Sequence, residues 1–135
     1  MNIVLGVTGS IAAYKAADIT SRLKKLGHNV DVILTENGSK IITALTLQTL
    51  SKNKVYMDMF EEITPTEVKH ISLAEKADLV LIAPATANII GKIAHGIADD
   101  FLSTVVMAAA NQAPVYIAPA MNTNMYENPI VQENI

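Results

Sequence analysis

The feature that most constrains the fold is a regular alternation of short apolar runs with segments of helical periodicity. The first run, residues 3–7, has no charged or polar side chain, which is typical of a strand covered on both faces. A turn at residues 8–10 and a helical pattern over residues 11–26 follow, and Gly27 ends that pattern. Such alternation predicts an α/β fold: a doubly wound, Rossmann-like (flavodoxin-like) parallel sheet with helices on both faces.

The alternation continues along the chain and predicts a single domain over residues 1–135. We expect strands at residues 30–34, 55–57, 79–83 and 115–118, the last one buried. We expect helices at residues 39–50 (in one or two pieces), 71–77, 86–94 and about 100–110. Residues 58–69 are expected to form a polar loop. Gly96 is the expected stop of one helix, and Asp99 or Asp100 the N-cap of the next. Asn128 and Pro129 are expected to begin a last helix, either one cut short or a frayed terminal helix.

Composition excludes several classes of function. The chain has 10 basic and 13 acidic residues, a net charge of -3, and no basic face, so no nucleic-acid partner is expected. It has no cysteine, which rules out a disulfide, a Cys-ligated zinc or a thiol nucleophile within these residues. No apolar run approaches the ~20 residues that cross a membrane, no signal-peptide pattern precedes the first strand, and no histidine pair has metal-ligand spacing. We expect a cytoplasmic protein with neither a membrane nor a metal partner.

Three segments that follow predicted strands carry groups suited to a ligand, at the strand ends where open parallel sheets bind ligands. The turn around Ser10 offers backbone N–H groups and a hydroxyl to an anion, with an ordinary tight turn as the alternative. Thr86 and Asn88 open a predicted helix, where capping by Thr86 is the alternative. Residues 119–129 combine Asn with Met, which suits a pocket that hydrogen-bonds one edge of a ligand and contacts an apolar face.

His70 is the candidate acid or base among the three histidines, because it lies where the predicted polar loop meets a helix. A surface role is the alternative. His95 precedes Gly96 at a predicted helix end, where a cation is favourable on general grounds and needs no functional explanation.

These segments occur in the order of a known set of motifs: GSIAAYKA from residue 9, then His70, then PATAN from residue 84, then PAMNTNMY from residue 119. Together they closely resemble the homo-oligomeric flavin-containing cysteine decarboxylases over essentially all 135 residues. Within that family the chain is most similar to the branch that decarboxylates 4′-phosphopantothenoylcysteine to 4′-phosphopantetheine in coenzyme A biosynthesis. The resemblance implies that FMN first oxidises the substrate cysteine to a thioaldehyde, and that loss of carbon dioxide then gives an enethiol.

The resemblance also implies which residues bind and react. The FMN phosphate would lie at Gly9, Ser10 and Ile11. Further FMN contacts are implied at Thr35, Ser39, Ala85, Thr86, Ala87, Asn88, Ile89 and Ala120. His70 matches the catalytic histidine of the family, Asn122 matches the catalytic asparagine that holds the substrate carboxylate, and Met125 matches a second substrate-binding position. A homo-oligomer, a trimer or a dodecamer of trimers, is implied, with its sites at subunit interfaces.

The chain departs from the family pattern at several positions. Tyr126 replaces a Trp, Thr86 replaces a Ser, and Ile89 replaces a Thr and so loses a hydroxyl. Family members continue with a flap that covers the substrate and carries a catalytic Cys, so we expect a domain without its C-terminal flap. After Lys92 there are four acids and no bases, so the cation for the substrate phosphate is expected from that flap, an earlier lysine or a neighbouring subunit.

Three alternatives remain open at this point. The first alternative to the decarboxylase is a relative that acts on another cysteine-containing substrate. The second is a non-catalytic FMN-binding or regulatory subunit. An NAD-binding domain is disfavoured, because the sequence lacks the GxGxxG pattern.

Overall fold

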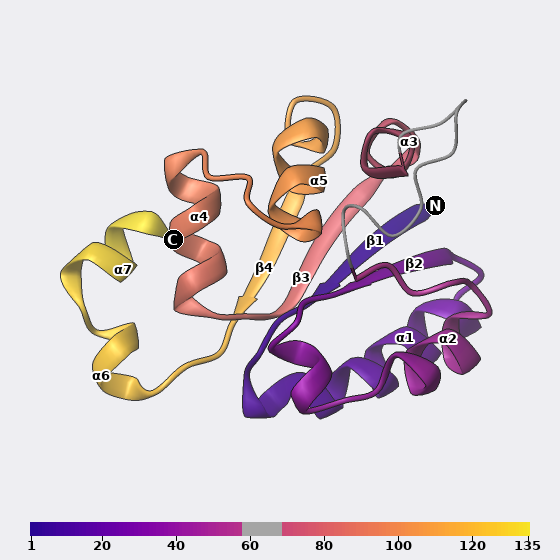
Figure 1. Cartoon of the computed structure of the whole chain (residues 1–135), viewed down its shortest axis with the longest axis horizontal. Helices are drawn as coiled ribbons and strands as arrows, with labels where there is room; N and C mark the ends of the chain where they lie inside the picture. The colour runs from indigo at the N-terminus through magenta and orange to yellow at the C-terminus, as the bar shows by residue number, and fades with distance from the viewer. Residues whose placement is uncertain (58–68) are drawn as a thin grey trace.

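The computed structural model describes the backbone of residues 1–57 and 69–135, and the side chains of residues 1–57 and 71–135. Its centre is a parallel sheet with the strand order β2-β1-β3-β4 (Figure 1). The strands are β1 (Asn2–Val7), β2 (Asn29–Leu34), β3 (Leu79–Ala85) and β4 (Val115–Pro119). The chain steps from β1 to β2 on one side and then returns to build β3 and β4 on the other. The strand order therefore reverses between β1 and β3, which is the position at which such sheets bind ligands.

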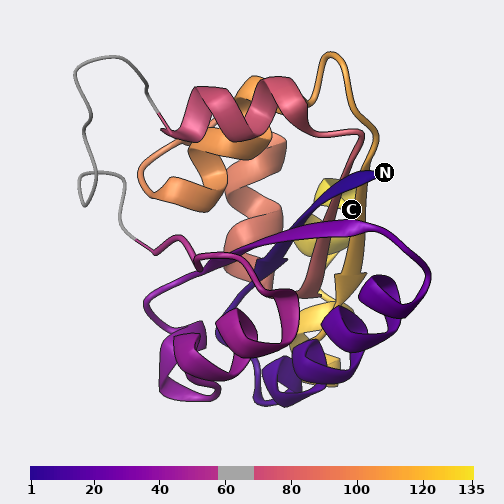
Figure 2. The same ribbon diagram turned by 90° about the vertical axis from the view of Figure 1, so that its right-hand side faces the viewer.

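Helices cover both faces of the sheet, as predicted (Figures 1 and 2). One face carries η1 (Ile11–Lys15), α1 (Ala16–Lys25), η2 (Gly38–Lys40) and α2 (Ala44–Ser51); the other carries α3 (Lys69–Lys76), α4 (Ala87–His95) and α5 (Phe101–Ala109). Two short helices, α6 (Thr123–Tyr126) and α7 (Pro129–Asn134), follow β4. Because helices lie on both faces of a parallel sheet, the doubly wound α/β class is confirmed.

Each strand divides its side chains between two cores, because successive residues point to opposite faces. Leu5 and Val32 are fully buried on the side of α1 and α2, while Val80 and Ile82 are buried on the side of α5. Burial of each such side chain stabilises the fold by roughly 1.5–3 kcal/mol. Gly6 lets α5 approach β1, since a Cβ built there would lie 2.6 Å from Leu102 Cδ1.

Helix ends follow the predicted caps. The Ser10 hydroxyl accepts from the N–H of Ala12 at 3.1 Å and begins η1, so the helix expected from residue 11 opens with a 3-10 turn. Asp100, and not Asp99, caps α5, in a reciprocal capping box with Ser103. Gly96 ends α4 with φ of 70°, a conformation that favours glycine. The Asn128 side chain caps α7, as expected.

Three predictions need correction or restriction. The strand at residues 115–118 is an edge strand and is not buried, since Tyr116 is 57% exposed. An apolar run is buried only where a helix covers the side chains of the strand. Residues 55–57 form only one parallel bridge, between Ile33 and Tyr56, within the described residues. Residues 58–68 of the predicted loop lie outside the described residues, and Lys69 already belongs to α3.

Candidate active site

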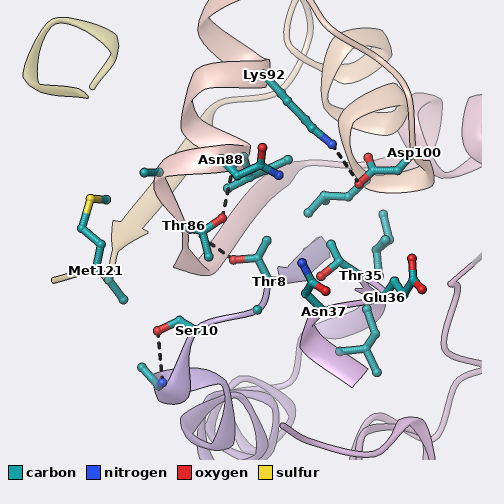
Figure 3. Close-up of a pocket in the computed structure, with 18 of the residues that line it drawn as sticks. Thr8, Ser10, Thr35, Glu36, Asn37, Thr86, Asn88, Lys92, Asp100 and Met121 are labelled. Carbon is teal, nitrogen blue, oxygen red and sulfur yellow. Dashed lines mark hydrogen bonds and ion pairs between the residues drawn. The ribbon is translucent and has the colours of Figure 1, made fainter. Parts of the chain in front are cut away.

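A cavity of about 1350 Å³ lies at the carboxyl edge of the sheet (Figure 3). Its walls come from the loops after β1, β2, β3 and β4, together with the start of α5. Typical small-molecule pockets are ~300–1,000 Å³, so this one has room for a ligand larger than a drug-sized molecule. The predicted segments therefore do converge at one edge, as the parallel strand order requires.

The turn after β1 forms the anion-binding end of the cavity. The Ser10 hydroxyl accepts from Ala12, which leaves its own proton for a ligand oxygen. Gly9 is required by packing: an added Cβ would lie 2.4 Å from Asn37 Cβ, so the loop after β2 presses directly on this turn. Backbone N–H groups at such a strand-to-helix turn favour a phosphate without any basic side chain.

The turn after β3 faces the first turn across the cavity. The Thr86 hydroxyl accepts from the N–H of Ile89 at 3.2 Å, which confirms the capping interpretation of Thr86. Its own backbone N–H donates to the Thr8 hydroxyl at 3.2 Å. Asn88 lies two residues further on at the same wall, as Figure 3 shows, and is an exposed residue that lines the cavity. The loop thus serves both purposes that its residue types suggested, since it caps α4 and lines the cavity.

The remaining wall is apolar with one amide on it. Met57, Leu102 and Met121 supply soft or aliphatic surface that suits the face of a flat ring. Asn122 caps α6 through its Oδ1, which accepts from the N–H of Asn124 at 2.8 Å. Among the described residues, none accepts a hydrogen bond from Asn122 Nδ2, so this side chain offers two N–H donors at the cavity rim.

The charge balance of the cavity is acidic. Lys92 is the one cation among the described lining residues, against Glu36, Asp99 and Asp100. Its Nζ lies 2.8 Å from Asp99 Oδ1 and 3.9 Å from Asp100 Oδ2. The hydrogen bond from Lys92 lowers the pKa of Asp99 below its ordinary value of 3.8. An anionic ligand must therefore rely on amide and hydroxyl donors more than on net charge.

Most of the residues predicted for the site line this cavity: Gly9, Ser10, Ile11, Thr35, Thr86, Ala87, Asn88, Ile89, Ala120, Asn122 and Met125. Two predicted contacts do not. Ser39 instead donates from its hydroxyl to the carbonyl of Glu36 at 2.5 Å, and Ala85 is fully buried beneath the site. His70 belongs to the first turn of α3, and its side chain lies outside the described residues.

Sequence reasoning missed several contributors to the cavity, among them Thr8, Asn37, Met57, Lys92 and Leu102. The sequence signal for Thr8 is its place directly after a buried strand, where a threonine hydroxyl readily forms hydrogen bonds with neighbouring backbone groups. Within residues 1–57 and 71–135, no group of three or more acidic or histidine side chains is arranged to hold a metal. In the same part of the chain, no helix has the length and apolar character needed to span a bilayer.

A doubly wound sheet with a partly apolar cavity at its switch point is the architecture of α/β proteins that bind nucleotide-like cofactors. The chain belongs to the Flavoprotein family, whose model matches residues 1–135. It is 52% identical over 134 residues to the coenzyme A biosynthesis bifunctional protein CoaBC of Bacillus subtilis, covering 99% of this chain and 32% of that protein. It is also 52% identical over 133 residues to the Streptococcus mutans protein named "Probable phosphopantothenoylcysteine decarboxylase", covering 98% of this chain and 74% of that one.

Among solved structures, the FMN-dependent cysteine decarboxylase SpaF superposes with a TM-score of 0.91 at 30% identity. That comparison covers 99% of this chain and 76% of SpaF. The chain thus spans about a third of the bifunctional relative and about three quarters of the shorter proteins it matches.

Proposed function

We propose that this chain is the FMN-binding domain of a phosphopantothenoylcysteine decarboxylase, a carboxy-lyase that makes 4′-phosphopantetheine in coenzyme A biosynthesis. The observation that carries the proposal is the meeting of the Ser10 turn, the Thr86 turn and Asn122 on one cavity. Identity of 52% to a relative named for this activity favours this substrate over that of SpaF, which is 30% identical.

The cavity fits FMN by the chemistry of its donors. The Ser10 turn suits the phosphate, because it supplies N–H groups and a hydroxyl proton. The apolar wall of Met57, Leu102 and Met121 suits the faces of the ring, and Asn88 suits its polar edge. In this proposal Thr35, Ala87, Ile89 and Ala120 complete the contacts, while Ser39 and Ala85 act only indirectly, through the loops they support.

Asn122 is proposed to hold the substrate carboxylate. Its Oδ1 accepts from the N–H of Asn124, which leaves the two N–H donors of Nδ2 for a ligand at the cavity that Asn122 lines. An amide gives directional donors to the carboxylate without the strong charge stabilisation that would oppose loss of carbon dioxide. Met125, also on the cavity wall, would contact the apolar part of the substrate.

His70 is proposed as the acid or base of the reaction. Bound FMN would supply an oxidising ring that takes a hydride equivalent from the substrate side chain and later returns it. A histidine near its ordinary pKa can accept the thiol proton in the oxidation at neutral pH. This role depends on the resemblance, since the His70 side chain lies outside the described residues.

A homo-oligomer, either a trimer or a dodecamer of trimers, is part of the proposal. Ile11 lines the cavity and is 80% exposed, and Tyr14 in the same turn is 61% exposed. Large apolar side chains left bare at the rim of a site are typical of a surface that a second copy covers. A neighbouring copy is one source of the cation for the substrate phosphate, beside the flap and an earlier lysine, since the cavity residue Lys92 is paired with Asp99. A cytoplasmic location is proposed as well, because a phosphorylated intermediate does not cross membranes unaided.

Two measurements test the proposal. Purified protein titrated with FMN should quench the fluorescence of the flavin and shift its visible absorption bands as the ring enters the cavity. FMN-loaded protein that also carries the flap implied by the resemblance should then release carbon dioxide from 4′-phosphopantothenoylcysteine, with 4′-phosphopantetheine identified by mass spectrometry. Protein that takes up no FMN would overturn the cofactor assignment; uptake with turnover only of peptides ending in cysteine would overturn the substrate.

A further inference from the structure

Thr8 joins the two loops that face each other across the cavity. Its hydroxyl donates to the carbonyl oxygen of Pro84 at 2.6 Å. It also accepts from the backbone N–H of Thr86 at 3.2 Å, a bond that Figure 3 shows. The Thr8 side chain is 2% exposed, so no water competes for either bond. One hydroxyl thus uses both its donor and an acceptor position on the same neighbouring loop.

The backbone ladder does not make this connection. Pairing between β1 and β3 ends at Gly6 and Ile82, two residues before Thr8 and Pro84. Pro84 has no N–H, so regular pairing has no donor to offer at this position. On the other side of β1 the ladder continues, because the N–H of Thr35 donates to Val7 O at 3.0 Å. The ends of β1 and β3 are therefore tied by a side chain, at the point where the strand order reverses.

Both loops that Thr8 ties are parts of the cavity wall. Gly9 and Ser10 follow Thr8 directly, and Thr86 and Ala87 follow Pro84. A ligand that spans the cavity must contact both loops at once, so its affinity depends on their separation. Preorganised spacing raises affinity because the ligand does not have to order the loops itself.

We propose that Thr8 is a positioning residue that sets the separation of the Ser10 turn and the Thr86 turn for a ligand held between them. This inference rests on the proposed function, because FMN is the ligand used to test it. Removal of the hydroxyl leaves the Pro84 carbonyl and the Thr86 N–H buried without a partner, and the two loops move apart to find water.

The test compares FMN binding by Thr8→Val, Thr8→Ser and a matched control. Thr20→Val is the control, since Thr20 is fully buried and its hydroxyl donates to Ala16 O at 2.8 Å within α1, away from the cavity. Thr8→Val should raise the Kd for FMN by roughly ten- to a hundredfold, whereas Thr8→Ser keeps the hydroxyl and should bind like the wild type. Thr20→Val should lose thermal stability but keep the Kd of the wild type.

Each outcome decides the inference. Equal Kd values for Thr8→Val and Thr20→Val, or failure of Thr8→Ser to retain binding, would overturn it while leaving the FMN assignment intact. Wild-type protein that binds no FMN would overturn the proposed function, and this inference with it. If Thr8→Val does not fold, Thr8→Ala takes its place, because it adds no methyl group against the Pro84 carbonyl. If both variants fail to fold while Thr20→Val folds, Thr8 is required for folding itself and the positioning role is rejected.

Discussion

The Oδ1 atom of Asn122 accepts a hydrogen bond from the N–H of Asn124 at 2.8 Å, so the cap of α6 occupies the oxygen of a side chain that lines the cavity. The oxygen is used within the chain, and the nitrogen remains for a ligand. The oxygen of this side chain caps a helix and its nitrogen is proposed to bind substrate, so a single substitution can remove binding and keep the cap.

Asn122→Asp should therefore keep the fold and FMN binding but lose substrate. An aspartate still caps the helix through an oxygen, whereas its second oxygen repels a carboxylate instead of donating to it. Loss of hydrogen bonds to a charged group, about 1.5–3 kcal/mol, predicts a roughly ten- to hundredfold fall in kcat/KM. Steady-state kinetics and FMN titration of the same preparation measure both effects.

Asn128→Asp is the matched control for that substitution. Asn128 caps α7 with the same geometry, accepting from the N–H of Ile130 at 2.9 Å, and it does not line the cavity. It should retain full activity. Equal activity of the Asn122 and Asn128 variants would remove Asn122 from the substrate site.

Gly9→Ala should weaken FMN binding for a steric reason. The new Cβ would lie 2.4 Å from Asn37 Cβ and 3.0 Å from the Asn37 carbonyl carbon, so the two loops must separate. Overpacking of this kind costs about 1–3 kcal/mol, which should appear as a lower midpoint of thermal unfolding and a higher Kd for FMN.

The control for Gly9 is Gly91→Ala, within α4. Its added Cβ would meet only Asn134 Nδ2, at 3.9 Å. Alanine in a helix interior is favoured over glycine by about 1 kcal/mol, so this variant should be as stable as the wild type or more so, with unchanged FMN affinity. A Gly9 variant that matches it in both measurements would show that the turn tolerates a side chain.

His70→Asn should abolish decarboxylation and leave FMN bound. An asparagine still forms hydrogen bonds but takes up no proton at neutral pH, and loss of a general acid or base lowers turnover by about 10²–10⁴. Rates of carbon dioxide release are compared with those of His95→Asn, whose exposed ring contacts Asn134 Oδ1 at 3.0 Å. Undiminished turnover by the His70 variant rejects its catalytic role.

Lys92→Gln should return the pKa of Asp99 towards 3.8, because the hydrogen bond from Lys92 is the main cause of its decrease. A pKa that is lower in the folded state than in the unfolded chain stabilises the fold above the unfolded value, and this contribution is lost as the pH falls through the folded value. The stability difference between wild type and variant should therefore shrink on acidification below about pH 4. Carboxyl titration by NMR checks the shift directly, and an identical Asp99 pKa in both proteins contradicts the assignment.

The strands and caps were predictable because their signals are local. The apolar run at residues 3–7 and the cap at Asp100 depend on neighbours within a few positions, and both are confirmed. Convergence of the predicted site segments at one sheet edge was predictable too, since parallel strands place their carboxyl ends together. This is why the Ser10 turn and Asn122 line the same cavity.

What could not be predicted depends on residues far apart in the sequence. The hydroxyl of Thr8 finds Pro84 76 residues away, and nothing near Thr8 indicates that partner. The exposure of Tyr116 depends on which helices reach β4, whereas its alternation pattern is the same for covered and uncovered strands. Which hydroxyls reach the cavity depends on the path of the loop after β2: Thr35 lines the cavity, whereas Ser39 donates to the carbonyl of Glu36 and does not line it.

The uncovered position of β4 has a consequence for how copies of the chain meet. Pro114 stands just before the strand and Pro119 ends it. Pro114 faces β3, since its carbonyl accepts from the N–H of Val80 at 2.9 Å. Because Pro119 has no N–H, it offers no donor to an incoming strand at the other end of β4. Pairing of two copies through this end of β4 is therefore disfavoured.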